Sequence, residues 1–112
     1  DAFESLRTGI RQAERPPHTV AEGLRTSLGD ITFPIVRDGV SEVLLVEEQE
    51  IITSTVMFVL RTKLLIEPSA GVVVAALLRY RNRFAGKRVG VILTGGNVDL
   101  VALGALAERI DG

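Results

Sequence analysis

The sequence predicts an α/β fold that contains part of a parallel β-sheet. Segments 42–46 and 88–93 are apolar on both faces, as buried strands of a parallel sheet are, and the shorter 64–66 is either a buried strand or an extended link. Segments with helical patterning separate them, and this alternation is typical of α/β layers. A parallel sheet of two or three strands leaves its edges bare, so the pattern also indicates that further strands lie outside this chain.

Two helices are predicted before the first strand. Residues 1–12 place apolar side chains on one helical side, with Asp1 as a cap, and Pro16 follows the predicted end. Residues 31–40 predict a short helix with Pro34 in its first turn, where a missing N–H costs nothing.

The next helix begins where carboxylates accumulate, since negative charge favours the exposed N–H groups of a first turn. Spacings of three and four residues predict its buried stripe. The carboxylates are Glu47, Glu48 and Glu50, and the stripe is Ile52, Val56, Val59 and Leu60.

A further helix starts at Pro68 and carries no charge on any face until Arg79. A helix that is apolar all round belongs inside a multi-layer structure. The last helix follows the strand at 88–93 and runs towards Ile110, with Asn97 or Asp99 as its cap.

Composition excludes several classes of function. The 112 residues allow one domain, and 46% hydrophobic residues indicate a face meant for another chain or domain. The net charge of −1 and the lack of an aromatic stacking platform to accompany the arginine cluster at 79–83 argue against nucleic-acid binding. The longest uncharged apolar stretch, 69–78, is too short to cross a membrane. The absence of cysteine is compatible with the cytoplasm and excludes a thiolate metal site.

Two short motifs carry the chemical information. Thr94-Gly95-Gly96 follows a predicted strand, so its hydroxyl reaches the carboxyl edge of the sheet, where open α/β sheets bind ligands. From the residues alone it is either a phosphate-binding turn or a tight turn that merely needs glycine. Glu67-Pro68-Ser69-Ala70-Gly71 is, from the residues alone, an ordinary helix start.

Together these motifs resemble the C-terminal third of the fold-type-II pyridoxal-phosphate-dependent threonine/serine dehydratases and serine racemases. The resemblance implies that residues 1–112 are the C-terminal portion of the large cofactor-binding domain. It also implies that the glycine-rich phosphate loop, the substrate-carboxylate loop and the Schiff-base lysine precede this chain. Neither Lys63 nor Lys87 matches that lysine, so no catalytic residue is expected here.

The resemblance assigns cofactor contacts to three residues. Thr94 takes the place of the family serine whose hydroxyl meets the pyridine nitrogen of pyridoxal phosphate. Gly23, in Thr19-Val20-Ala21-Glu22-Gly23, packs against one face of the ring, the alternative being an ordinary loop glycine. Glu67 borders the cofactor pocket. Asp1 aligns with a ligand of Mg²⁺ or another divalent cation, the alternative being a helix cap.

The resemblance implies a hydroxy-amino-acid ammonia-lyase that converts L-serine or L-threonine, small-molecule substrates, into a 2-oxo acid and ammonia. This chain would act only with a complementary N-terminal chain or domain, within a homo-oligomer of the complete enzyme. A fragment of a serine racemase is the neighbouring interpretation. Two further alternatives are a free-standing small α/β binding or structural module, and a regulatory module that binds an anion at Gly95-Gly96.

Overall fold

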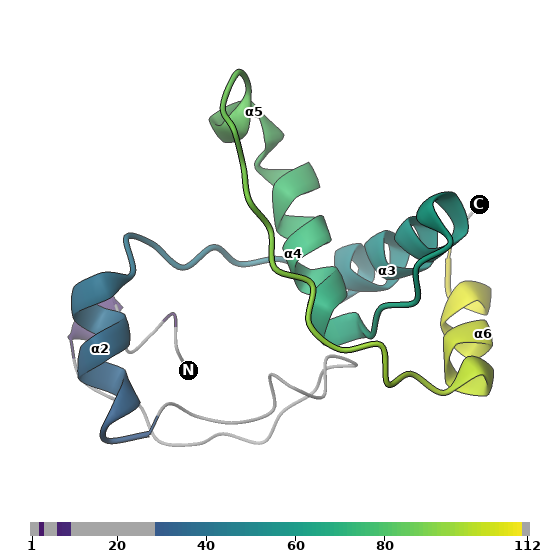
Figure 1. The fold of residues 1–112 in the computed structure, drawn as a ribbon, viewed down its shortest axis with the longest axis horizontal. Helices are drawn as coiled ribbons and strands as arrows, with labels where there is room; N and C mark the ends of the chain where they lie inside the picture. The colour runs from purple at the N-terminus through teal and green to yellow at the C-terminus, as the bar shows by residue number, and fades with distance from the viewer. Residues whose placement is uncertain (1–2, 4–6, 10–28, 111–112) are drawn as a thin grey trace. The chain divides into compact units, whose positions relative to one another are not determined.

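The computed structural model describes residues 3, 7–9 and 29–110, and these form two compact units (Figure 1). Residues 29–45 belong to one unit and residues 46–110 to the other. Most of the helix predicted at 1–12 lies outside the described residues.

The first unit contains helix α2, Thr32–Gly39, which confirms the helix predicted at 31–40. The backbone N–H of Gly29 donates to Thr32 Oγ1 over 3.0 Å, and the Phe33 N–H donates to the Gly29 carbonyl. These bonds hold the residues that precede the helix. Phe33 is the one buried residue of α2.

Helix α3, Glu48–Thr62, begins with a capping box, in which Glu47 and Glu50 each bind the other's backbone N–H. It ends at Lys63, which has a positive φ of 63°. The predicted stripe is confirmed at Ile52 and Val56, which are buried, whereas Leu60 is 61% exposed. The buried face of α3 therefore consists of Ile51, Ile52, Ser54, Thr55 and Val56.

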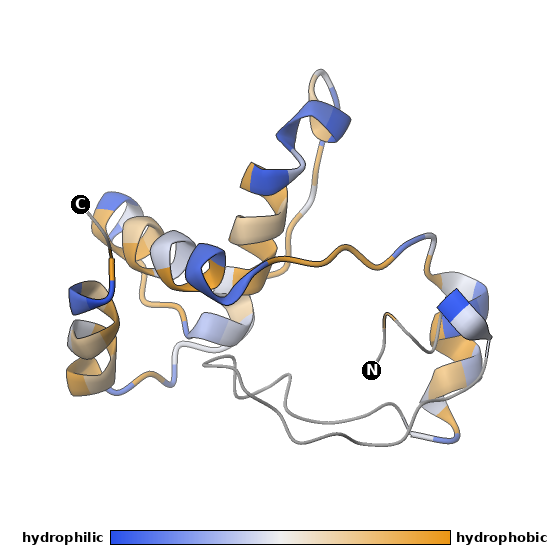
Figure 2. Cartoon of the chain, turned by 180° about the vertical axis from the view of Figure 1, so that it is seen from behind, coloured by the Kyte–Doolittle hydropathy of each residue, from blue (hydrophilic) through white to orange (hydrophobic). Residues whose placement is uncertain are grey.

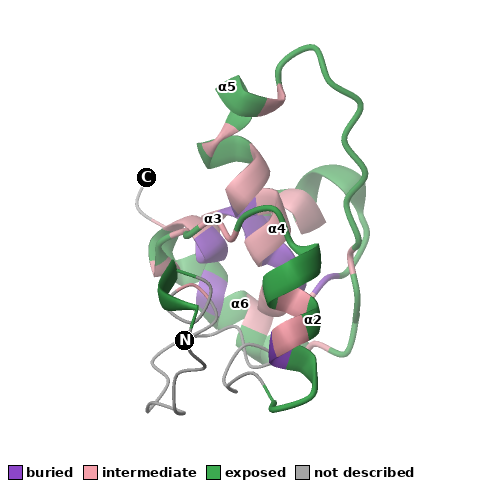
Figure 3. Ribbon diagram, turned by 90° about the vertical axis from the view of Figure 1, so that its left-hand side faces the viewer, coloured by how far each residue is buried: buried purple, intermediate pink, exposed green. Residues whose placement is uncertain are grey.

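Helix α4, Pro68–Arg79, starts at the predicted proline, and the four-residue helix α5, Arg81–Phe84, follows it. α4 packs against α3 through small residues, because Ala70, Gly71 and Ala75 are its buried positions (Figure 3). Its other positions are partly or largely exposed, and Leu78 is 50% exposed. Within the described residues only one side of this apolar helix is covered.

Helix α6, Leu100–Glu108, completes the core of the second unit. Its buried Leu106 packs with Ile52 and Val56 of α3. The side-chain amide of Gln49 donates to the Arg109 carbonyl over 3.0 Å, which ties the end of α6 to the start of α3. Leu103 is half-buried against the same cluster, whereas most other residues of this largely apolar helix are exposed (Figure 2), with Val101 at 80%.

Asp99 is the cap of α6, since its Oδ1 accepts a hydrogen bond from the Val101 N–H over 2.9 Å. Replacing Asp99 by alanine is expected to lower the free energy of unfolding by about 1 kcal/mol, the usual cost of losing such a cap. Urea denaturation measures this change. Asn97→Ala is the matched control, because Asn97 does not occupy the cap position; an equal loss in the control would contradict the assignment.

The three predicted strands are not formed within the described part of the chain. Residues 42–46, 64–66 and 88–93 have backbone that is assigned to neither helix nor strand. Strands of a parallel sheet are held by hydrogen bonds to neighbouring strands, and these segments find no such neighbour among residues 29–110. Ile92, predicted to be buried, is accordingly 79% exposed. The prediction of formed strands is wrong for 42–46 and 88–93, whereas 64–66 is an extended link, one of its two predicted forms. The prediction of a sheet that is incomplete on its own is confirmed for the described residues.

No helix among residues 29–110 has both the length and the apolar character needed to cross a bilayer.

Candidate functional site

The structure brings the two sequence motifs together. Glu67 is the N-cap of α4, and its carbonyl accepts hydrogen bonds of 3.0 Å from the N–H groups of Ala70 and Gly71. After α5 the chain returns along α4 and passes the start of that helix before it enters α6 (Figure 1). Gly95 thereby lies against the side chain of Glu67.

Both glycines of the Thr94-Gly95-Gly96 turn are needed for this close approach. Gly95 has a φ of +79°, and a Cβ built on it would overlap Glu67 Oε1 and lie 2.9 Å from Glu67 Cδ. A Cβ on Gly96 would lie 3.1 Å from the carbonyl oxygen of Leu65. A side chain at Gly95 would therefore be strained and would displace the Glu67 carboxylate, whereas one at Gly96 would require a shift of a few tenths of an ångström.

The remaining predicted site residues divide into two groups. Thr94 is exposed and lies next to Gly95, and Glu67 is half-buried, so these two belong to one region of the molecule. Gly23 and Asp1 lie outside the described residues, and their roles stay predictions. Among residues 29–110, together with 3 and 7–9, no three His, Cys, Asp or Glu side chains gather as metal ligands would.

Gly95→Ala is expected to lower the free energy of unfolding by about 1–2 kcal/mol, because an L-residue is strained at this φ. The carboxylate of Glu67 must also move to admit the new methyl group. Thermal or urea unfolding tests this, with Gly90→Ala as the matched control, since a Cβ at Gly90 meets no atom within 4 Å. Equal stability of the two variants would contradict the packing of the turn against Glu67.

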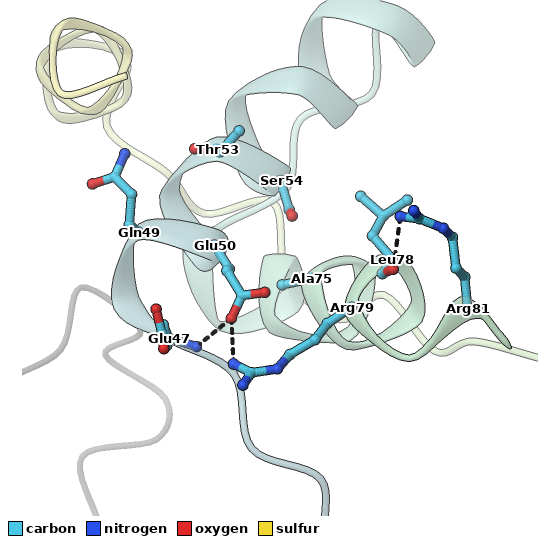
Figure 4. A pocket seen from close by; sticks show the side chains of 9 residues that line it. All are labelled: Glu47, Gln49, Glu50, Thr53, Ser54, Ala75, Leu78, Arg79 and Arg81. Atoms are coloured by element: carbon cyan, nitrogen blue, oxygen red, sulfur yellow. Dashed lines mark hydrogen bonds and ion pairs between the residues drawn. The ribbon is translucent and has the colours of Figure 1, made fainter. Parts of the chain in front are cut away.

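A concave region lies elsewhere, between the start of α3 and the end of α4 (Figure 4). Glu50 Oε1 accepts hydrogen bonds from the Glu47 N–H over 2.8 Å and from Arg79 Nη1 over 2.6 Å. The bond to Glu50 raises the pKa of Arg79. The hollow measures about 420 Å³ and is lined by Glu47, Gln49, Glu50, Thr53, Ser54, Ala75, Leu78, Arg79 and Arg81.

Sequence reasoning did not predict this hollow. The Glu47–Glu50 spacing signals only a helix start, and Arg79 marks only the end of an apolar helix. Their ion pair joins positions 29 residues apart, and no local pattern reveals such a contact. Glu50 and Arg79 form an ion pair with each other, so the charged groups that line the hollow connect α3 to α4. We therefore interpret the hollow as a structural junction between these helices. The region around Glu67 and Thr94 remains the stronger candidate site.

Comparison with known proteins identifies a family that covers most of the chain. Residues 1–95 match the family described as "Pyridoxal-phosphate dependent enzyme". The chain is 42% identical to the beta-hydroxyaspartate dehydratase of Paracoccus denitrificans over 100 residues, which are 89% of the chain and 32% of that protein. It is 46% identical to the serine racemase of Mus musculus over 107 residues, covering 92% of the chain and 32% of the racemase.

Solved structures agree with these matches. The maize serine racemase superimposes with a TM-score of 0.83 at 32% identity, over 98% of this chain and 36% of that one. The structural neighbours have fold type II, and this chain spans about a third of the length of the relatives it matches. The chain therefore belongs to the family of pyridoxal-phosphate-dependent enzymes.

Proposed function

We propose that this chain is the C-terminal portion of the cofactor-binding domain of a hydroxy-amino-acid ammonia-lyase. The complementary N-terminal part, with the Schiff-base lysine, completes the enzyme, which acts as a homo-oligomer. The observation that carries the proposal is the approach of Gly95 to Glu67, because it joins the two family motifs beside the Thr94 hydroxyl. The similarity to a beta-hydroxyaspartate dehydratase supports lyase chemistry.

The residues of this region fit pyridoxal phosphate. Thr94, Gly95 and Gly96 are all exposed, so a flat ring can reach this turn. Thr94 is exposed and its hydroxyl can donate or accept a hydrogen bond. The Glu67 carboxylate lies against Gly95 on the protein side of the turn, where it supports the turn.

The chain's own residues then have distinct tasks. Thr94 binds the pyridine nitrogen through a group whose pKa is far above 7, so it does not hold that nitrogen protonated, as an aspartate would. Bound pyridoxal phosphate supplies an electron sink for the α-carbon. A neutral partner at the nitrogen limits that sink, which suits prompt loss of a β-hydroxyl over transamination. Gly23 leaves room at the ring face, and Asp1 supplies a ligand for a divalent cation.

The overall reaction removes the α-proton and the β-hydroxyl of L-serine or L-threonine, and water then releases a 2-oxo acid and ammonia. Racemisation is the second candidate, favoured by the 46% identity to a serine racemase. The two outcomes differ in whether the α-carbon regains a proton before the hydroxyl leaves. The groups that deliver this proton belong to the complementary part of the enzyme.

Turnover by the protein that carries this chain distinguishes the candidates. The assay follows 2-oxo acid release from L-serine, L-threonine and L-threo-3-hydroxyaspartate, and chiral chromatography follows D-serine. We expect 2-oxo acid as the main product and an absorbance band near 410–420 nm, a property of the bound cofactor. The matched control is the 112-residue chain alone, which should show neither turnover nor the band.

D-serine as the main product would replace the lyase by the racemase. Native mass spectrometry tests whether a complementary N-terminal part exists. We expect a species heavier than the 12.1 kDa of this chain, because the chain should be bound or joined to that part. A lone chain that unfolds cooperatively and never binds pyridoxal phosphate would favour a free-standing module instead.

A further inference from the structure

A close contact between α3 and α4 lies one helical turn from Glu67. Thr55 of α3 is fully buried, and its Oγ1 donates a hydrogen bond of 2.7 Å to the Ile51 carbonyl. A Cβ built on Gly71 of α4 would overlap Thr55 Oγ1 and lie 3.0 Å from Cβ and 3.4 Å from Cα of the same residue. The overlap with Oγ1 is the severe clash, since the distances to Cβ and Cα require a shift of only a few tenths of an ångström. Rotation of the Thr55 side chain would break its hydrogen bond to the Ile51 carbonyl inside the buried contact.

Gly71 is linked to the candidate site through the first turn of α4. Its N–H donates to the Glu67 carbonyl over 3.0 Å. A displacement of the backbone at Gly71 is therefore passed to Glu67, and the Glu67 side chain lies against Gly95. Thr55, Gly71, Glu67 and Gly95 thus form a continuous series of contacts that ends next to Thr94.

We propose that Gly71 is a positioning residue for the cofactor site. Its missing side chain lets α4 lie directly on Thr55, and this contact places Glu67 where it supports the Thr94-Gly95-Gly96 turn. Gly71 itself is buried against α3, so it acts through Glu67 and not by touching the cofactor. The proposal rests on the proposed function, because it takes the turn as part of the pyridoxal-phosphate site.

The test is a size exchange across the helix contact in the protein that carries this chain. Gly71→Ala is expected to weaken pyridoxal-phosphate binding about tenfold in an absorbance titration, equivalent to about 1.4 kcal/mol. Thr55→Ala alone removes the hydroxyl that the new methyl group would strike, and should change the dissociation constant less than threefold. The double variant Gly71→Ala/Thr55→Ala is expected to recover most of the lost affinity.

Gly104→Ala is the matched control for replacing a helical glycine. Gly104 lies in α6, and a Cβ there meets no atom within 4 Å, so cofactor affinity should stay unchanged. If Gly71→Ala does not fold, the double variant tests the proposal. It is expected to fold and to bind pyridoxal phosphate with a dissociation constant within threefold of the wild-type value, and failure to do so would contradict the proposal.

Two results would overturn the positioning role. One is a folded Gly71→Ala protein with a lowered melting temperature but an unchanged cofactor dissociation constant, which is the pattern of a purely structural glycine. The other is a loss of affinity that Thr55→Ala fails to restore. Failure of the proposed function gives a different pattern, since Thr94→Val would then leave cofactor affinity unchanged whatever happens at Gly71.

Discussion

Replacing Thr94 by valine is expected to weaken pyridoxal-phosphate binding about 10- to 100-fold in the protein that carries this chain. Valine keeps the shape of threonine and removes the hydroxyl. The pyridine nitrogen would then be covered without a hydrogen-bond partner, which costs about 1–3 kcal/mol. Equilibrium dialysis or an absorbance titration measures the dissociation constant, and turnover of L-serine should fall in parallel.

Two further substitutions at this position separate the hydroxyl from the bulk of the side chain. Thr94→Ser is the matched control, because serine keeps the hydroxyl and occupies this place in the resembling family; its affinity should stay near that of the wild type. Thr94→Asp should shift the products towards transamination, because a carboxylate holds the ring nitrogen protonated. Equal affinities of the valine and wild-type proteins would remove Thr94 from the site.

Ile52→Ala is expected to lower the free energy of unfolding by about 2–5 kcal/mol, the range for truncating a fully buried aliphatic side chain. Ile52 is 0% exposed and packs with Val56 and Leu106, so it joins α3 to α6. Its truncation leaves a cavity at the place where α3 and α6 share buried apolar side chains. Urea denaturation of the protein that carries this chain measures the loss, and Ile52→Val should cost about 0.5–1.5 kcal/mol.

Leu60→Ala is the matched control on the same helix. Leu60 is 61% exposed, so its truncation should change stability by no more than about 0.5 kcal/mol. A loss below about 1 kcal/mol for Ile52→Ala would contradict the assignment of Ile52 to the core. A large loss at Leu60 would instead identify it as a contact for the complementary part of the enzyme.

Local signals were sufficient to predict where three of the described helices begin, whereas the short helix α5 was not predicted. α3 begins where Glu47 and Glu50 form a capping box, α4 begins at Pro68, and Asp99 caps α6. Each of these signals acts within one helical turn, so neighbouring residues contain the whole interaction. The family likewise follows from short motifs, since residues 1–95 match the model of pyridoxal-phosphate-dependent enzymes.

The strand prediction failed for a reason that is also physical. Segments 42–46 and 88–93 carry the apolar pattern of buried strands, but a strand is a property of at least two chain segments. The apolar pattern predicts that these segments pair with neighbouring strands, and residues 29–110 contain no such strands. Ile92 shows the difference, because the pattern predicts a buried side chain and the structure leaves it 79% exposed.

By itself, the sequence determined where α3, α4 and α6 begin, the family and the candidate residues Thr94 and Glu67, because each depends on neighbours along the chain. Only the tertiary structure decided that Gly95 lies against Glu67 and that Gly71 lies against Thr55. Both contacts join residues from separate segments and require the absence of a side chain. A glycine in a sequence does not reveal which distant atom will occupy the space it leaves.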